Sequence, residues 1–211
     1  CGRDWSSDVC SSDLGDASFR EFYRIQKNTK TSILVKANKD KFRNLIVYAA
    51  INQILNKNKI RAPKLINEYF KSSMMEIEDL GSVSFLEFIK QKKNKFKFYI
   101  NLIDLIFKLQ KLKLKKRINF KKYKIILKNY NIKELHRESD LFFDWYLKNN
   151  CKKNNFKNNK TKIKKELNSL YKKLYFQNKC FVHRDFHASN VMCHKKDRKS
   201  TRLNSSHVRT S

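Results

Sequence analysis

The segment that most constrains the fold is FVHRDFHASNVM (181–192). Apolar residues stand at both of its ends, and His183, Arg184, Asp185 and Asn190 lie between them. This pattern predicts a short strand, a polar loop and the start of another strand. The Asn190 amide supplies an oxygen atom of the kind that Mg²⁺ prefers. Packing alone does not explain such a loop, so we interpret it as a site of chemistry.

The two ends of the chain carry related sequences. DRKSTRLNSSH (197–207) can be encoded by a DNA segment whose opposite strand encodes DWSSDVCSSDL (4–14). Two such segments are very improbable in a natural gene, and the DNA resembles a sequencing-library adapter. We therefore expect residues 1–14 and 197–211 to be artefactual ends that are loose or lack a packed core. The alternative is a pair of disordered, Ser-rich tails.

The chain is strongly basic, with 49 Lys and Arg against 19 Asp and Glu in 211 residues, a net charge of +30. The excess is mainly Lys and accompanies abundant Asn, Ile and Phe, all residues of A/T-rich codons. Because no nucleic-acid-binding signature is present, we expect a solvated basic surface, no nucleic acid partner and no membrane. A basic module that binds nucleic acid or an anionic membrane is the alternative.

The cysteines outside the two ends are Cys151, Cys180 and Cys193, an odd number without metal-ligand spacing. This usage predicts a reduced, cytoplasmic chain. Cys180 and Cys193 flank the polar loop, and we expect both to be small buried strand residues. No apolar run approaches the ~18 residues of a membrane span.

Residues 15–80 show the pattern of a small α+β lobe. Apolar and alternating residues predict a hairpin over 18–26 and 31–38. A helical stripe follows over 41–58, and two further strands are expected over 62–70 and 73–81.

The sequence pattern of residues 81–196 predicts a second, mainly helical lobe. Ser84 and Glu87 form a capping box that opens a helix over 84–91. Helices are then expected to fill the chain up to about Tyr175, namely over 98–112, 134–149 and 162–177. The stripe in the second of these is expected to be core. It contains Leu141, Phe142, Trp145 and Tyr146.

Four motifs occur in a fixed order: GDASFREFYRI (15–25), MEIEDLG (75–81), ELHRESDLFFDWYL (134–147) and the polar loop. Together they resemble the aminoglycoside phosphotransferase and choline kinase family, over essentially all of residues 15–196. The first and third are most similar to bacterial kinases of cell-wall amino sugars, N-acetylmuramate and N-acetylglucosamine, at the anomeric hydroxyl. The resemblance implies an α+β, protein-kinase-like two-lobe fold, truncated here after the catalytic loop. It also implies an ATP-dependent phosphotransferase that acts on a hydroxyl of an amino sugar or amino alcohol.

The resemblance assigns roles within the loop. Asp185 would accept the substrate hydroxyl proton, and Asn190 would bind Mg²⁺. His183 would brace the loop, and the role of His187 is open. A second metal-binding carboxylate belongs on the next hairpin, and Asp197 comes too early for it, so we expect the 211-residue chain to be inactive.

The nucleotide contacts implied by the resemblance lie in residues 15–80. Gly15 and Ser18 would belong to the turn that covers the phosphates, and Arg20 could reach a phosphate. Lys36 ends an apolar strand, where kinases place their phosphate-binding lysine.

The helix over 41–58 contains no Glu to orient Lys36, which is a departure from the kinase pattern. Backbone groups of Glu78 and Leu80, in the interlobe hinge, would bind the adenine. A nucleotide-binding pseudokinase is a further alternative.

Overall fold

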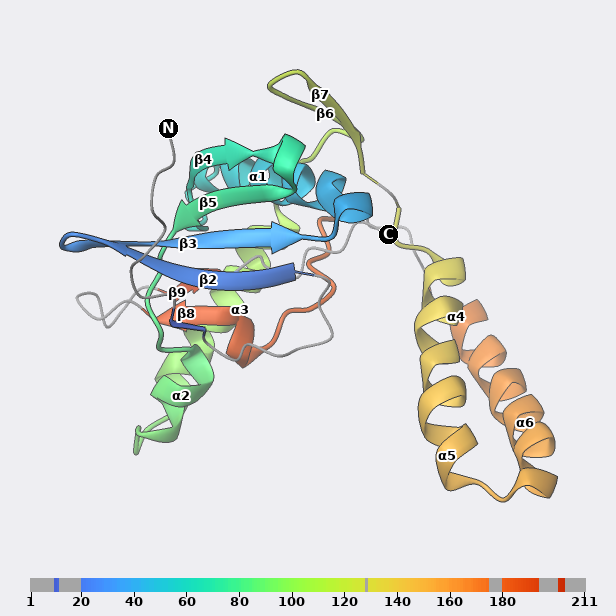
Figure 1. The fold of residues 1–211 in the computed structure, drawn as a ribbon. Coiled ribbons are helices and arrows are strands. Elements are labelled where there is room, and N and C mark those ends of the chain that lie inside the picture. The colour runs from blue at the N-terminus through green and yellow to red at the C-terminus, as the bar shows by residue number, and fades with distance from the viewer. Residues whose placement is uncertain (1–9, 12–19, 128, 175–179, 194–200, 204–211) are drawn as a thin grey trace. The chain divides into compact units, whose positions relative to one another are not determined.

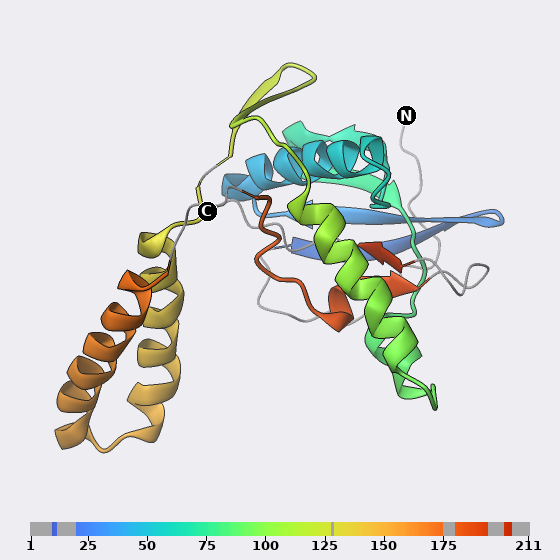
Figure 2. The same ribbon diagram turned by 180° about the vertical axis from the view of Figure 1, so that it is seen from behind.

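The computed structural model describes residues 10–11, 20–127, 129–174, 180–193 and 201–203. The described residues form two compact units, shown in Figures 1 and 2. The first, called the sheet unit, contains the residues up to Leu127 and from Phe181 onward. The second, called the helical hairpin, contains the residues from 129 to Cys180. The lobe boundary expected at Gly81 remains a prediction.

The sheet unit is built on a five-stranded antiparallel sheet in the order β1-β2-β3-β5-β4. Strands β2 and β3 pair along their full length, and Asn28 adopts a φ of 55° in the tight turn between them. The expected hairpin is therefore confirmed over residues 20–37. The strands are β1 (Cys10–Ser11), β2 (Arg20–Lys27), β3 (Lys30–Ala37), β4 (Leu65–Tyr69) and β5 (Met74–Glu78).

Helix α1 (Phe42–Lys57) follows a short 3-10 turn, η1 (Lys39–Lys41), and packs against β4 and β5 (Figure 1). The sheet contributes alternate residues to this core, including Val35, Met75 and Ile77, which are at most 3% exposed. The buried residues of α1 are Leu45, Ile46, Val47, Tyr48, Ala49, Ala50, Ile51, Asn52 and Leu55.

After β5 the chain turns at Gly81, whose φ of 96° favours glycine. The expected capping box is present, because the Glu87 amide donates to the Ser84 side chain and the Ser84 amide donates to the Glu87 carboxylate. It opens α2 (Phe85–Lys90), which is followed by α3 (Phe96–Gln110). Both helices were expected from the sequence.

Strand β8 (Val191–Cys193) lies beside the segment that precedes α2, since the Cys193 amide donates to the Val83 carbonyl at 2.9 Å. Ser84 and Met192 form a further bridge between the two segments. The segment before α2 thus fixes the C-terminal end of the polar loop. The loop ends in a short 3-10 turn, η4 (Ala188–Asn190), directly before β8.

The expectation of continuous helix between Ser84 and Tyr175 is wrong for residues 117–126. They form an antiparallel hairpin of β6 (Arg117–Phe120) and β7 (Tyr123–Ile126). Apolar residues alternate with polar ones on β6 and over the first three residues of β7, and Lys121 adopts a φ of 51° at the turn. Period-two alternation of this kind favours strands over helix.

The strand expected before the polar loop is also absent from the described residues, since Phe181 to His183 are irregular. Arg184 adopts a φ of 69°, which turns the chain out of an extended path. Cys180 is exposed rather than buried, and Cys193 is half-buried in β8. Burial raises the pKa of the Cys193 thiol to about 11.

Short pieces of both chain ends pair with the fold, so these pieces are not loose, and the lack of a packed core at the ends stays a prediction. Cys10–Ser11 pairs with the outer edge of β2, and β9 (Thr201–Leu203) pairs with β8. Asp197 lies outside the described residues. Ladder pairing uses backbone groups, which an open strand edge offers to almost any extended segment.

The helical hairpin consists of α4 (Ile132–Leu141), a π-helical turn η3 (Phe142–Leu147), α5 (Lys148–Asn150) and α6 (Lys153–Lys172). The first three run on continuously, and α6 returns beside them (Figure 1). His136 and Tyr171 meet edge to face across the hairpin at 4.9 Å.

The expected core stripe of this hairpin is mostly exposed: 53% for Leu141, 43% for Phe142, 72% for Trp145 and 59% for Tyr146. Phe143 is buried instead. The prediction that the stripe is core is therefore wrong for these residues. The wider π-helical turn changes the phase of the side chains, so Phe143 is the residue directed inward.

Within the described residues, none of the helices combines the length and the apolar character that crossing a membrane requires.

Candidate active site

The polar loop brings its titratable side chains together. The Asn190 amide nitrogen donates to the Asp185 carboxylate and to the Asp185 backbone carbonyl, both at 2.9 Å. His187 Nε2 lies 2.9 Å from the same amide nitrogen and 3.4 Å from Asp185 Oδ1. Asn190 is 5% exposed, whereas the Asp185 carboxylate is 36% exposed. A buried amide thus fixes a carboxylate that solvent or a substrate can reach.

Two residues that directly precede Asp185, His183 and Arg184, support the conformation of the loop. His183 is 5% exposed and contacts Phe186 edge to face at 6.0 Å, which fits a bracing role. Arg184 adopts a left-handed backbone conformation that is uncommon for a residue other than glycine. Strain of this kind is often found at functional sites, because the surrounding structure must impose it.

The loop offers one chemically suitable ligand for Mg²⁺. Asn190 supplies an amide oxygen, which is a hard oxygen ligand. In the part of the chain that the structure describes, no group of three or more His, Cys, Asp or Glu side chains could hold a metal ion. An amide oxygen of this kind fits a metal that also takes oxygen ligands from a bound phosphate.

The hinge-like segment contains a buried acid. Asp79 has a 7% exposed side chain and accepts two hydrogen bonds from Arg24 of β2, at 2.8 and 3.3 Å. The Gly81 amide donates to the same carboxylate at 2.8 Å. Burial acts to raise the pKa of Asp79, but the hydrogen bonds from Arg24, Gly81 and Thr31 hold it below its ordinary value. Asp79 thereby ties the hinge to the sheet.

The two hinge residues nominated for adenine binding differ in their surroundings. Leu80 is buried at 6% exposure. The Glu78 amide donates to the Lys64 carbonyl at 2.8 Å, and its carboxylate accepts from Arg61 at 2.7 Å. The Glu78 side chain therefore stabilises the edge of the sheet through its ion pair with Arg61.

Lys36 does not point toward α1. It lies directly opposite Glu21 in the β2–β3 register, and its ammonium group is 3.3 Å from the Glu21 carboxylate. Both side chains are more than half exposed. Tyr23 donates to the same carboxylate at 2.5 Å, and together the bonds from Tyr23 and Lys36 lower the pKa of Glu21.

Arg20 occupies the other face of the hairpin. It pairs with Ala37 in the register, and both residues are buried, at 6% and 5% exposure. Its guanidinium carbon lies 5.6 Å from the centre of the Tyr48 ring of α1, a cation–π arrangement. Gly15 and Ser18, the other residues nominated for phosphate contacts, lie outside the described residues.

Comparison with known proteins decides the family. Residues 10–201 match the phosphotransferase enzyme family, which is most of the chain. The chain belongs to the phosphotransferase enzyme family. The expectation of a phosphotransferase family is therefore confirmed, whereas the match does not identify the acceptor.

Solved structures confirm the α+β fold of this phosphotransferase. The aminoglycoside phosphotransferase APH(4)-Ia is similar with a TM-score of 0.64 and 10% identity, over 95% of this chain and 67% of that chain. Spectinomycin phosphotransferase APH(9)-Ia, solved with ADP and spectinomycin, gives a TM-score of 0.50 and 12% identity, over 88% and 59%. No curated protein sequence matches this phosphotransferase. The likeness concerns the fold alone at these identities.

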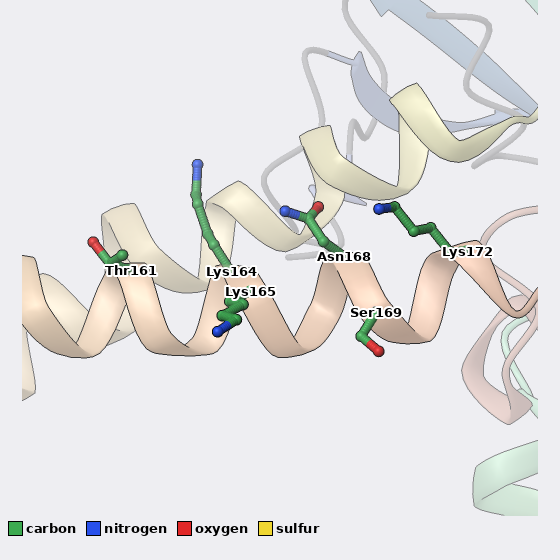
Figure 3. A pocket seen from close by; sticks show the side chains of 6 residues that line it. All are labelled: Thr161, Lys164, Lys165, Asn168, Ser169 and Lys172. Carbon is green, nitrogen blue, oxygen red and sulfur yellow. The ribbon is translucent and has the colours of Figure 1, made fainter.

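A surface hollow lies on α6, in the helical hairpin. It is lined by Thr161, Lys164, Lys165, Asn168, Ser169 and Lys172, all on one helix (Figure 3). Its lining contains neither a carboxylate nor a nucleophilic thiol, so it does not supply the groups that phosphoryl transfer needs.

Sequence reasoning missed three contacts of this phosphotransferase: Asp79 with Arg24, Lys36 with Glu21, and Arg20 with Tyr48. A signal for the strand pairs was available. Side chains alternate across a strand, so Lys36 and the buried Val35 cannot share a face. The partner on α1 could not be found in this way, because the helix packing decides it.

Proposed function

We propose that this protein transfers the γ-phosphoryl group of ATP to a hydroxyl of a small molecule, an amino sugar or amino alcohol. The carrying observation is the Asp185–Asn190 pair, which is joined at 2.9 Å and sits in a loop of the family's sequence form. The motifs 15–25 and 134–147 support a cell-wall amino sugar as the acceptor. The absence of a membrane-spanning helix from the described residues is compatible with a cytoplasmic location.

Asp185 would accept the proton of the acceptor hydroxyl as the oxygen attacks the γ-phosphorus. Its carboxylate is partly exposed and is held by the Asn190 amide, so it is oriented before substrate binds. Mg²⁺, when bound by Asn190 and the phosphates, would neutralise charge that develops on the transferred group. Positioning and charge neutralisation are the main terms in such reactions.

The adenine would bind at the hinge, through backbone groups of Glu78 and Leu80. The Arg24–Asp79–Gly81 hydrogen bonds support this assignment, because they fix the hinge backbone relative to β2. A fixed backbone loses little entropy when it binds a planar base.

The test is ATP-dependent phosphorylation of amino sugars and amino alcohols, measured in a complete homologous protein with the same loop and in this chain. Replacement of the residue at the Asp185 position by Asn should lower kcat by about 10²–10⁴-fold, the usual contribution of a general base. Asp40→Asn, at an exposed acid, is the matched control. Unchanged turnover after the first substitution would refute the assignment, and ATP binding without transfer in the homologue would indicate a pseudokinase.

A further inference from the structure

Two cations were candidates for holding the nucleotide phosphates, Lys36 and Arg20, and the structure separates them. The core face of the sheet is defined by Val35, which is fully buried. Lys36 is the next residue, so it lies on the opposite face, where Glu21 binds it. A salt bridge on that exposed surface leaves Lys36 directed away from α1.

Arg20 lies on the core face. Its cross-strand partner is Ala37, which comes two residues after Val35 on β3 and therefore lies on the same face of the sheet. The guanidinium is stacked over Tyr48, a residue of α1 that is only 1% exposed. In kinases, this helix carries a Glu beside the phosphate-binding lysine. Here, α1 instead carries an aromatic ring, Tyr48, beside an arginine, Arg20.

The position along the sheet is also suitable. The hinge follows Glu78, which pairs with Ser32 near one end of β3, whereas Arg20 pairs with Ala37 at the other end. Five residues of strand separate these ends, roughly 16 Å. A nucleotide with its base at the hinge would extend its phosphates toward Arg20. The chain from Phe181 to His187 runs past the same end of the sheet in both views (Figures 1 and 2).

We propose that Arg20, held over Tyr48, binds the phosphates of the nucleotide, and that Lys36 does not. The pair replaces the lysine–glutamate pair of kinases, which accounts for the lack of Glu in α1. A guanidinium presents a planar fork of N–H donors that matches phosphate oxygens, and the Tyr48 ring orients it. This inference rests on the proposed function, because it requires a nucleotide at the hinge.

The experiment is titration calorimetry of the 211-residue chain with ATP, ADP and adenosine. Arg20→Met should weaken ATP and ADP binding by about 10–100-fold, the value of a charge-assisted contact, and should change adenosine affinity by less than about twofold. Arg20→Lys should fall between wild type and Arg20→Met, since it keeps the charge and loses the fork. Lys36→Met should bind ATP as the wild type does, and Lys30→Met is a matched control on the same hairpin.

Arg20 is buried, so each variant is first checked by its thermal unfolding curve. If Arg20→Met does not fold, two other measurements test the proposal. The first is the ATP affinity of Arg20→Lys. The second is the acetylation rate of Lys36 in the wild-type chain, which ATP should leave unchanged. Protection of Lys36 by ATP, or normal ATP affinity in the Arg20 variants, would overturn this proposal alone. A wild-type chain that binds neither ATP nor adenosine would overturn the proposed function as well.

Discussion

The sheet unit and the helical hairpin are stabilised in different ways. The sheet unit has a continuous hydrophobic core that joins α1, β3, β5, α2 and α3. In the described part of the hairpin, Phe143 is the fully buried apolar residue, while Leu141 and Trp145 are 53% and 72% exposed. Burial of apolar area is the larger stabilising term in proteins, so the sheet unit holds most of the folding free energy.

Charged side chains replace apolar packing in the hairpin. The ammonium groups of Lys160 and Lys164 lie 5.6 and 5.4 Å from the Phe143 ring centre. The same two lysines pair with Asp144 at 3.3 Å and with Asp140 at 2.7 Å. These contacts specify how the helices align, but each contributes little free energy because water and salt screen it. The comparison teaches that one chain can combine a packed unit with a weakly held one.

The largest expected effect separates two leucines. Leu45→Ala, in the core of α1, should lower the free energy of unfolding by about 2–5 kcal/mol, because it leaves a cavity among packed residues. Leu141→Ala, at the exposed stripe of the hairpin, should change it by less than about 0.5 kcal/mol. Urea unfolding followed by circular dichroism measures both. Equal losses would show that the stripe is buried in solution and that the two units do not differ as described.

An intermediate effect is expected at the buried acid of the hinge. Asp79→Asn should cost about 1–3 kcal/mol at neutral pH, since it weakens the charge-assisted bonds from Arg24. The folded-state pKa of Asp79 is lowered, so its stabilisation is complete above the unfolded value of about 3.9 and is lost as the pH falls through the folded pKa.

The pH dependence gives this prediction its control. The wild-type chain should lose more stability than Asp79→Asn when the pH falls below about 4. Asp40→Asn, at an exposed carboxylate, should follow the wild type. Parallel stability curves for wild type and Asp79→Asn would contradict the role given to the Arg24 bonds.

The smallest effect concerns the charged contacts of the hairpin. Lys164→Met should destabilise the hairpin by about 0.2–1 kcal/mol, because the Asp140 pair is exposed and screened and the Lys164 side chain that contacts Phe143 is itself 44% exposed. Raising NaCl from about 0.05 to 0.5 M should reduce the difference. Amide hydrogen exchange of α4 and α6 reports the effect, and Lys165→Met is the control on the neighbouring position. A difference that does not respond to salt would assign the effect to packing.

Elements whose signals are local could be predicted from the sequence. The β2–β3 hairpin, α1 and the capping box at Ser84 were all predicted, because turn residues, apolar periodicity and capping act within a few residues. The polar loop was recognised for the same reason, as its Asp and Asn occur at a fixed spacing. The geometry then placed Asp185 and Asn190 in direct contact.

The tertiary structure alone decided which faces meet. The sequence did not reveal that Lys36 faces Glu21, that Arg20 lies over Tyr48, or that Phe143 rather than Trp145 is buried. Periodicity tells which side chains share a face, but a face becomes core only when another element packs on it. The β6–β7 hairpin was missed because its strands have four residues each, too short a pattern to separate strand from helix until their pairing is known. Strand register and helix packing are relations between distant segments, and for that reason they were settled only in the folded chain.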